Sequence, residues 1–153
     1  MQKNTKEKVL GYIVRNINQK WELLLFNQTG APEAGYQIPG GTVESSDTQI
    51  TDALLREIKE ESGLEDLTIV NKIIYELYFH PVKQEFQERH FFLVYTDIET
   101  NYWTHSVKSS DEDQGLEFNY FWVDVEKELT LAVDQHIGIK HIRNYLIHIS
   151  MEL

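Results

Sequence analysis

The sequence contains no cysteine, and this absence removes several classes of chemistry at once. Disulfide scaffolds, thiolate metal sites and cysteine nucleophiles are all excluded, and a reducing compartment, the cytoplasm by default, is expected. Cationic residues are also few, because 14 Lys and Arg stand against 25 Asp and Glu, a net charge of −11. That excess of negative charge argues against a general binder of nucleic acids or of anionic membranes.

Long hydrophobic runs are missing as well, and no stretch is long enough to span a bilayer. The apolar run that follows the first lysines, 9–14, is too short for the core of a signal peptide. No internal repeat and no flexible linker divides the chain. With 153 residues, 41% of them hydrophobic, the sequence predicts a single domain over residues 1–153. Composition does not decide the oligomeric state, so a homodimer stays open.

The pattern of apolar residues predicts strands first, then a helix, more strands and a closing helix. Short apolar runs bounded by polar or Gly/Pro segments predict strands at 9–14, 21–26, 67–70, 73–79, 90–95 and 118–123, a short strand end at 36–38 and a hairpin loop over 84–89. Helical spacing predicts a helix near 48–62, with N-cap candidates at Ser46, Asp47 and Thr48 and a C-terminal cap at Gly63. A second amphipathic helix is expected from His136 onward. The fold class predicted from this order is α+β, a mixed sheet packed against helices.

Three glutamates on the first predicted helix are the most informative feature of the sequence. Glu57, Glu60 and Glu61 stand at positions i, i+3 and i+4 and therefore share one face of the helix. One interpretation is a solvated acidic face, with Arg56 paired to Glu60. The other is a site for a hard cation, because Mg²⁺ takes oxygen ligands and is held by carboxylates against substrate phosphates.

Together with the upstream Pro39-Gly40-Gly41, the run Arg-Glu-Ile-Lys-Glu-Glu-Ser-Gly-Leu over 56–64 resembles the signature of the Nudix hydrolases, G-x5-E-x7-R-E-U-x-E-E-x-G-U, where U is a bulky aliphatic residue. The second half of the signature, R-E-U-x-E-E-x-G-U, is matched at every position by residues 56–64. The first half departs from the pattern, because Asp47 stands where glutamate is expected and eight residues rather than seven separate it from Arg56. The resemblance favours the cation site over the acidic face, and the departure bears on substrate preference and rate more than on the metal.

The resemblance implies a Nudix-like α/β/α sandwich with a mixed sheet, a loop-helix-loop catalytic motif, and hydrolysis of a diphosphate linkage in a nucleoside diphosphate derivative. It implies that Glu57 and Glu61 are the main ligands of Mg²⁺ or Mn²⁺, with Glu60 in support and the Gly40 carbonyl as a further ligand. Arg56 is implied to orient the glutamates by ion pairing. Such a metal would bridge phosphate oxygens and lower the pKa of a bound water.

The proton acceptor is left open by the resemblance. Family members use either a glutamate of the motif or an acidic residue of a later loop, which here offers Glu112, Asp113 and Glu117. Each of these three also has the simpler interpretation of a solvated loop charge.

Candidates for substrate binding come from aromatic and cationic residues near predicted loops. Tyr36 and Trp103 are candidates for stacking a base, with packing as the alternative role. Arg15 and Arg89 are candidates for phosphate contacts, with a surface or ion-pair role as the alternative.

The expected function is metal-dependent hydrolysis of a nucleoside di- or triphosphate. The alternatives are an ADP-ribose or nucleotide-sugar pyrophosphatase and a non-catalytic domain that senses a nucleotide. An isomerase of the isopentenyl diphosphate type would lead one to look for a catalytic cysteine, which the chain lacks. A small nucleotide is the expected partner, with no membrane and no nucleic acid.

Overall fold

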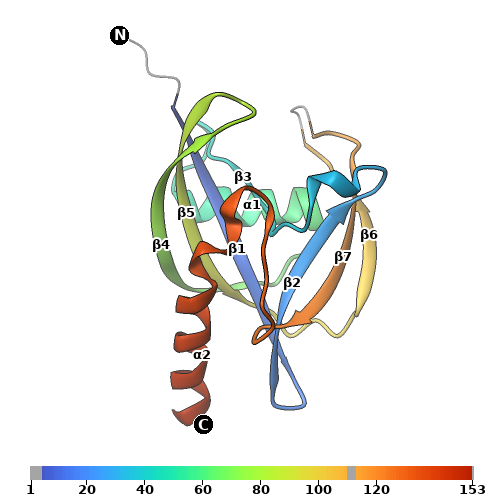
Figure 1. Cartoon of the computed structure of the whole chain (residues 1–153), viewed down its shortest axis with the longest axis vertical. Coiled ribbons are helices and arrows are strands. Elements are labelled where there is room, and N and C mark those ends of the chain that lie inside the picture. Colours follow the sequence, from blue (N-terminus) through green and yellow to red (C-terminus); the bar gives the residue numbers. More distant parts are fainter. Residues whose placement is uncertain (1–4, 110–112, 153) are drawn as a thin grey trace.

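The computed structural model describes residues 5–109 and 113–152, and its centre is one mixed sheet (Figure 1). The strands are β1 (Thr5–Ile17), β2 (Lys20–Gln28), β3 (Gly40–Thr42), β4 (Thr68–His80), β5 (Glu85–Tyr95), β6 (Tyr102–Ser106) and β7 (Glu117–Asp124). They run in the order β4-β5-β1-β2-β7-β6, with β3 paired to β1. The β1–β5 pair is parallel and the others are antiparallel.

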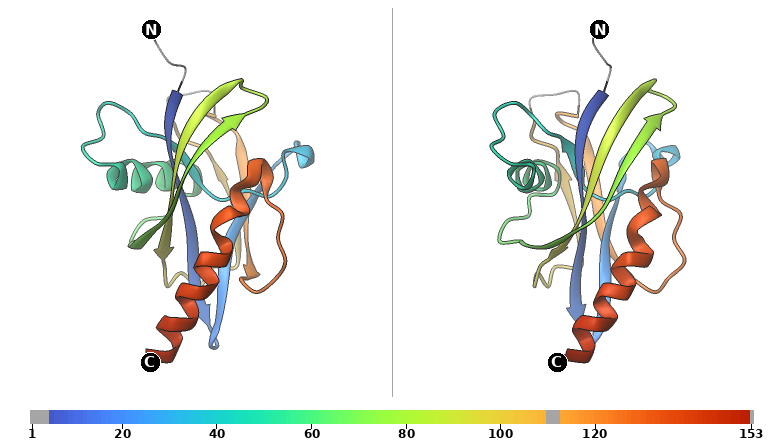
Figure 2. Two further views of the ribbon diagram at one scale, coloured as in Figure 1. Left: turned by 60° about the vertical axis from the view of Figure 1, so that its left-hand side comes forward. Right: turned by 90° about the vertical axis from the view of Figure 1, so that its left-hand side faces the viewer.

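Two helices cover opposite faces of this sheet (Figure 2). One is α1 (Ile50–Ser62), and the other is α2 (Ile139–Glu152), which follows the 3₁₀ segment η2 (Ala132–Gly138); a short 3₁₀ turn, η1 (Pro32–Ala34), follows β2. Side chains of β1 alternate between two cores, so that Val9 and Ile13 face α1 while Leu10 and Tyr12 face α2. The predicted α+β sandwich with a mixed sheet is therefore confirmed.

Strands β1 and β2 separate from each other at one end, and this separation prepares the site. The last residues of β1, from Val14 to Ile17, pair with β2 across a tight turn. Farther back along β1, Lys8 to Leu10 pair with β3 instead. Leu10 on β1 and Phe26 on β2 both line one pocket there.

Two expectations about the strands need correction, and one strand was not predicted. The segments 67–70 and 73–79 form one strand, β4, because irregularities between Ile69 and Asn71 and between Lys72 and Ile74 absorb the interruption. Residues 85–89, expected in a loop, belong to β5, where polar side chains line a pocket instead of a core. The edge strand β6 was not predicted, since its sequence, Tyr-Trp-Thr-His-Ser, contains no run of apolar residues.

The predicted first helix begins two residues later than expected. Its N-cap is Gln49, whose backbone N–H donates to Asp52, and neither Ser46, Asp47 nor Thr48 takes that position. At the other end Gly63 adopts the left-handed conformation expected of a C-terminal cap. The second helix begins at Ile139, after η2. In the part of the chain that the structure describes, no helix is both long and apolar enough to cross a membrane.

Candidate active site

The close approach of β3 to α1 creates the carboxylate site. A Cβ placed on Gly41 would overlap the carboxylate of Glu57 and lie only 2.6 Å from its Cγ, so only glycine leaves room for that side chain. In the antiparallel β1–β3 ladder, Leu10 and Gly40 form a pair that is not hydrogen-bonded. The backbone N–H and carbonyl of Gly40 therefore point away from β1. The Gly40 N–H donates to Oε1 of Glu61 at 3.0 Å.

Arg56 organises the loop before α1 and two of the glutamates. Its Nε and Nη2 donate to the two oxygens of Asp47 at 3.0 and 2.8 Å, a bidentate pair, and Nη2 also reaches the carbonyl of Thr42. Its Nη1 donates to Glu57 at 2.9 Å and to Glu60 at 3.2 Å. The extra residue of the motif is accommodated in the loop 43–49, and the shorter Asp47 still reaches the arginine.

Glu61 is buried where a charge is costly. Burial raises the pKa of Glu61 well above its usual range, against the lowering effect of the Gly40 hydrogen bond, and the carboxylates of Glu57 and Asp113 raise it further. Only 8% of the residue is exposed. Because a buried carboxylate next to others favours a nearby positive charge, this cluster has the electrostatics of a cation site.

The donor set fits Mg²⁺ or Mn²⁺ chemically. The glutamate oxygens and the Gly40 carbonyl are all hard ligands, and the gap above Gly41 admits the Glu57 carboxylate. Within residues 5–109 and 113–152, no three acidic or histidine side chains already converge as a ligand cluster. Glu57 and Glu60 share the Nη1 of Arg56, and Glu61 turns to Gly40, so like charges are kept apart.

The C-terminal end of α1 is held by side chains from β6 and β7. Nε1 of Trp103 donates to the carbonyl of Ser62 at 2.9 Å, and the Tyr120 hydroxyl donates to that of Glu61 at 2.9 Å. Nε2 of His105 lies 3.1 Å from the carbonyl of Glu60. These contacts satisfy carbonyls that a helix end leaves unpaired, and they fix the glutamates in place. Trp103, predicted to stack a base, stacks on Tyr120 instead and does not line the pocket.

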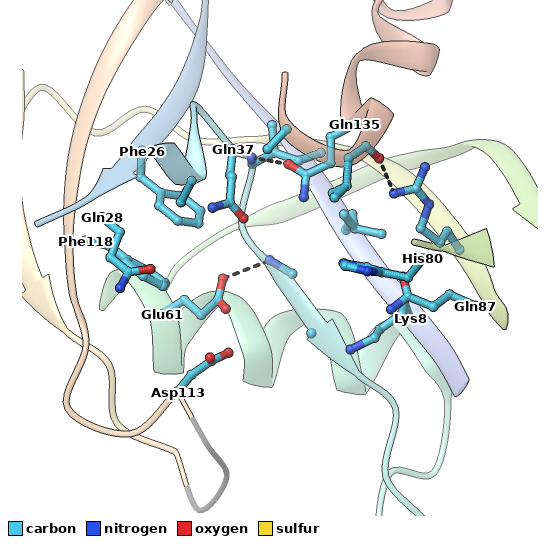
Figure 3. Close-up of a pocket in the computed structure, with 18 of the residues that line it drawn as sticks. Lys8, Phe26, Gln28, Gln37, Glu61, His80, Gln87, Asp113, Phe118 and Gln135 are labelled. Atoms are coloured by element: carbon cyan, nitrogen blue, oxygen red, sulfur yellow. Dashed lines mark hydrogen bonds between the residues drawn. The ribbon is translucent and has the colours of Figure 1, made fainter. Parts of the chain in front are cut away.

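A pocket of about 310 Å³ opens beside Glu61 (Figure 3). Asp113 faces Glu61 across one side of it, while Lys8 and His80 lie on another. Lys83 also lines the pocket, and Nζ of Lys8 donates to Thr42 at 2.6 Å. Burial and Lys83 lower the pKa values of both Lys8 and His80. The pocket thus joins an acidic side to a cationic side, although the chain as a whole is strongly negative.

Sequence reasoning missed the cationic side and the amides of the pocket. Besides Lys8, His80 and Lys83, the wall includes two stacked rings and four glutamines, three of them on β2, β5 and η2 and one in the segment before β3, namely Phe26, Phe118, Gln28, Gln87, Gln135 and Gln37. One pattern in the sequence could have revealed this wall. Glu85, Gln87 and Arg89 stand two positions apart, so on a strand they share one face, and Gln87 and Arg89 on that face line the pocket. Arg89 does line the pocket, as its candidacy for phosphate contacts requires.

The candidates for proton acceptor differ in position. Asp113 lines the pocket, whereas Glu117 is exposed at the start of β7 and does not. Glu112 lies outside the residues that the structure describes. Tyr36 is 49% exposed, packs edge-on against Phe121 and does not line this pocket, although its neighbour Gln37 does.

Arg15, predicted to meet phosphates, lies away from the pocket in a buried structural cluster. Its Nε donates to Glu22 at 2.8 Å and its Nη2 to Asn101 at 2.8 Å, while the Nη1 donates to carbonyls of the loop 96–101. The guanidinium also lies 4.2 Å from the centre of the Trp122 ring. All of its nitrogens are thus used within the fold.

Replacing Arg15 by Met is expected to lower the free energy of unfolding by about 3 kcal/mol, because the carbonyls of Ile98 and Thr100 and the side chains of Glu22 and Asn101 all lose their donor. The kcat/KM of the folded variant should equal that of the parent. Urea unfolding and steady-state kinetics measure the two effects. A folded Arg15→Met variant with normal stability and a raised KM would return Arg15 to the substrate site.

The fold and the site define a class of protein: an α+β domain whose glycine-bearing strand and glutamate-bearing helix face a polar pocket. The NUDIX domain family model matches residues 6–142. The chain therefore belongs to the NUDIX domain family, as its sequence resemblance predicted.

Solved structures share this fold at low sequence identity. An Ap4A hydrolase from C. elegans in a binary complex is 23% identical with a TM-score of 0.67, over 94% of this chain and 98% of that one. The NUDIX domain of NrtR from Shewanella oneidensis, complexed with ADP ribose, is 13% identical with a TM-score of 0.68, over 95% and 90%. A MutT NUDIX hydrolase from Burkholderia pseudomallei is 17% identical with a TM-score of 0.62, over 90% and 98%. No curated protein matches the chain.

Proposed function

We propose that this protein is a divalent-metal-dependent pyrophosphohydrolase that cleaves a diphosphate linkage in a small nucleotide. The observation that carries the proposal is the buried carboxylate of Glu61, held by the Gly40 N–H and facing a pocket with cations on another side. Similar folds in an Ap4A hydrolase and in a domain complexed with ADP ribose support a nucleotide ligand.

Each residue of the motif has a separate task in this proposal. Glu57, Glu60, Glu61 and the Gly40 carbonyl hold Mg²⁺ or Mn²⁺, which, when bound, neutralises phosphate charge and activates water. Arg56 is a positioning residue, because its guanidinium fixes Glu57 and Glu60 while Asp47 fixes the guanidinium.

The pocket walls orient the substrate and offer an acceptor for the proton of the attacking water. Lys8 and Lys83 attract phosphate oxygens and leave the scissile linkage between them and the glutamates. Asp113 is the described residue of the later loop placed to accept a proton, since it faces Glu61 across the pocket (Figure 3).

A nucleoside di- or triphosphate is the first substrate class in this proposal. ADP-ribose and nucleotide sugars are the second class, because one similar fold is complexed with ADP ribose. A sensor without turnover is the competing function. Such a sensor could dispense with the charged residues of the motif, yet Arg56, Glu57, Glu60 and Glu61 are all present.

Product release from a substrate panel tests the proposal. Nucleoside di- and triphosphates, nucleotide sugars and dinucleoside polyphosphates are incubated with Mg²⁺, Mn²⁺ or EDTA, and the nucleotide products are separated by chromatography. We expect turnover of at least one class with either metal and a loss of at least about 10²-fold with EDTA, since metal stabilisation of the transition state amounts to several kcal/mol. Tight nucleotide binding without turnover under any condition would establish the sensor instead.

A further inference from the structure

One wall of the pocket carries amide groups that the fold does not use. The side chains of Gln28 and Gln37 line this wall and make no hydrogen bond with any residue in 5–109 or 113–152. Gln135, on η2, is different because the residue is only 6% exposed and one of its two polar side-chain atoms is hydrogen-bonded within the fold. Its Oε1 accepts the backbone N–H of Ile38 at 2.8 Å.

This hydrogen bond fixes which way the Gln135 amide points. Since the oxygen must face Ile38, the nitrogen must face the cavity, and the amide presents only donors there (Figure 3). Within the described ranges, 5–109 and 113–152, the Nε2 has no acceptor. No side-chain nitrogen or oxygen of the described residues is both buried and without a partner, so this Nε2 is open to the cavity, where it can donate to an acceptor on a ligand.

The backbone around Gln135 is strained and firmly held. Val133 and Asp134 have φ values of 44° and 58°, and a β-branched residue with positive φ is a genuine outlier. Nη1 of Arg89 donates to the Val133 carbonyl at 2.8 Å, and the Tyr12 hydroxyl donates to the Gln135 carbonyl. Strain of this kind concentrates at ligand sites, where the surrounding structure maintains it. The fold therefore places Gln135 before any ligand binds.

The close approach of β1 to η2 completes this support. The Gly138 N–H donates to the Tyr12 hydroxyl at 3.0 Å, and a Cβ on Gly138 would lie 2.8 Å from the Tyr12 ring. Tyr12 is fully buried, so it cannot move aside easily. The amide of Gln135 is thus oriented by two elements, the segment before β3 and the strand β1.

The surroundings of the amide suit a flat heterocycle. Phe26 and Phe118, stacked with ring centres 4.3 Å apart, share the pocket with Leu10 and Ala132. An apolar wall with a few fixed polar groups is the usual setting for a nucleobase or a similar ring. The sugar and phosphates then extend toward Lys8 and Glu61, which line the same pocket.

The kind of polar group indicates what the base must offer. Because its Oε1 is taken by Ile38, Gln135 offers the cavity a donor alone, which matches an acceptor such as a ring nitrogen of a purine base. The guanidinium in this region, Arg89, is occupied by Glu76 and the Val133 carbonyl and lies 3.9 Å from the centre of the Tyr78 ring. We propose that Gln135 is a specificity-determining residue that donates through Nε2 to a ring nitrogen of a purine base. This inference rests on the proposed binding of a nucleotide in the pocket.

Binding of adenine analogues without one ring nitrogen tests the proposal directly. The probes are adenosine 5′-(α,β-methylene)diphosphate, which resists hydrolysis, and its 1-deaza, 3-deaza and 7-deaza forms, titrated calorimetrically into the full chain. We expect one deaza form to bind about 10-fold to 100-fold more weakly than the parent nucleotide, because it lacks the acceptor.

The variant Gln135→Glu provides the matched control, because glutamate has nearly the same volume and still accepts the Ile38 N–H. The penalty for the affected deaza form should disappear in Gln135→Glu, and in the second variant Gln135→Met. Methylenediphosphonate, which has no base, should bind the parent and the uncharged Gln135→Met variant alike.

Equal binding of all deaza forms to the parent, a penalty that persists in both variants, or no nucleotide binding would overturn the proposal. The hydrolysis proposal fails separately, because these probes report binding without turnover. Discrimination among the deaza forms in a protein that cleaves nothing would leave Gln135 as the base-reading residue of a sensor.

Discussion

Replacing Glu61 by Gln is expected to abolish most of the activity while leaving the protein as stable as before or more stable. The amide oxygen of the introduced glutamine could still accept the Gly40 N–H, which keeps the contact between β3 and α1. The variant loses the charge that holds the cation, so kcat/KM should fall by at least about 10²-fold. In metal-free buffer the free energy of unfolding should not fall, because the cost of burying a carboxylate beside Glu57 disappears.

Kinetics with Mg²⁺ and urea unfolding with EDTA measure these two effects on the same preparations. Glu65→Gln is the matched control, because Glu65 is an exposed glutamate that pairs with Lys59 at the surface. It should change neither quantity appreciably. A Glu61→Gln variant that retains the parent's kcat/KM would contradict the role proposed for Glu61.

Replacing Gly41 by Ala is expected to lower kcat/KM by about 10²-fold through Glu57, since the loss of a metal ligand removes several kcal/mol of stabilisation. The added Cβ would overlap the Glu57 carboxylate, so the carboxylate must leave its position. Gly41 has no positive φ, which means that alanine strains the site by contact alone. Overpacking should also cost about 1 to 3 kcal/mol of stability.

A double-mutant cycle with Glu57→Ala separates this effect from general disruption. If Gly41→Ala acts by displacing Glu57, it should lower kcat/KM little further once Glu57 is already alanine. Ser46→Ala, an exposed change in the loop between β3 and α1, serves as the control for handling and folding. Full additivity of the two losses would show that Gly41 serves some purpose other than making room for Glu57.

The carboxylate motif could be predicted from the sequence because its geometry is local. Glu57, Glu60 and Glu61 share a face of α1 for the reason that any helix places such positions together. The pairing of Arg56 with Glu60 follows from the same spacing. Gly63 ends the helix as its conformational freedom predicts.

Residues outside the motif were harder to assign because their roles depend on distant partners. Trp103 and Arg15 have the chemistry of ligand contacts, yet Trp103 caps α1 and Arg15 binds the loop 96–101. Asp47 was correctly singled out at the acidic position of the motif, although its contact with Arg56 depends on how the loop folds.

The sequence by itself determined the family, the helix that bears the glutamates and the alternation of the core strands, since all of these are periodic or local patterns. Only the tertiary structure decided what surrounds them. Ile38 and Gln135 are 97 positions apart and meet through one hydrogen bond, while Lys8 lines the pocket because β1 turns from β2 to pair with β3. Such contacts depend on how the strands separate, and no local pattern of residues specifies that separation.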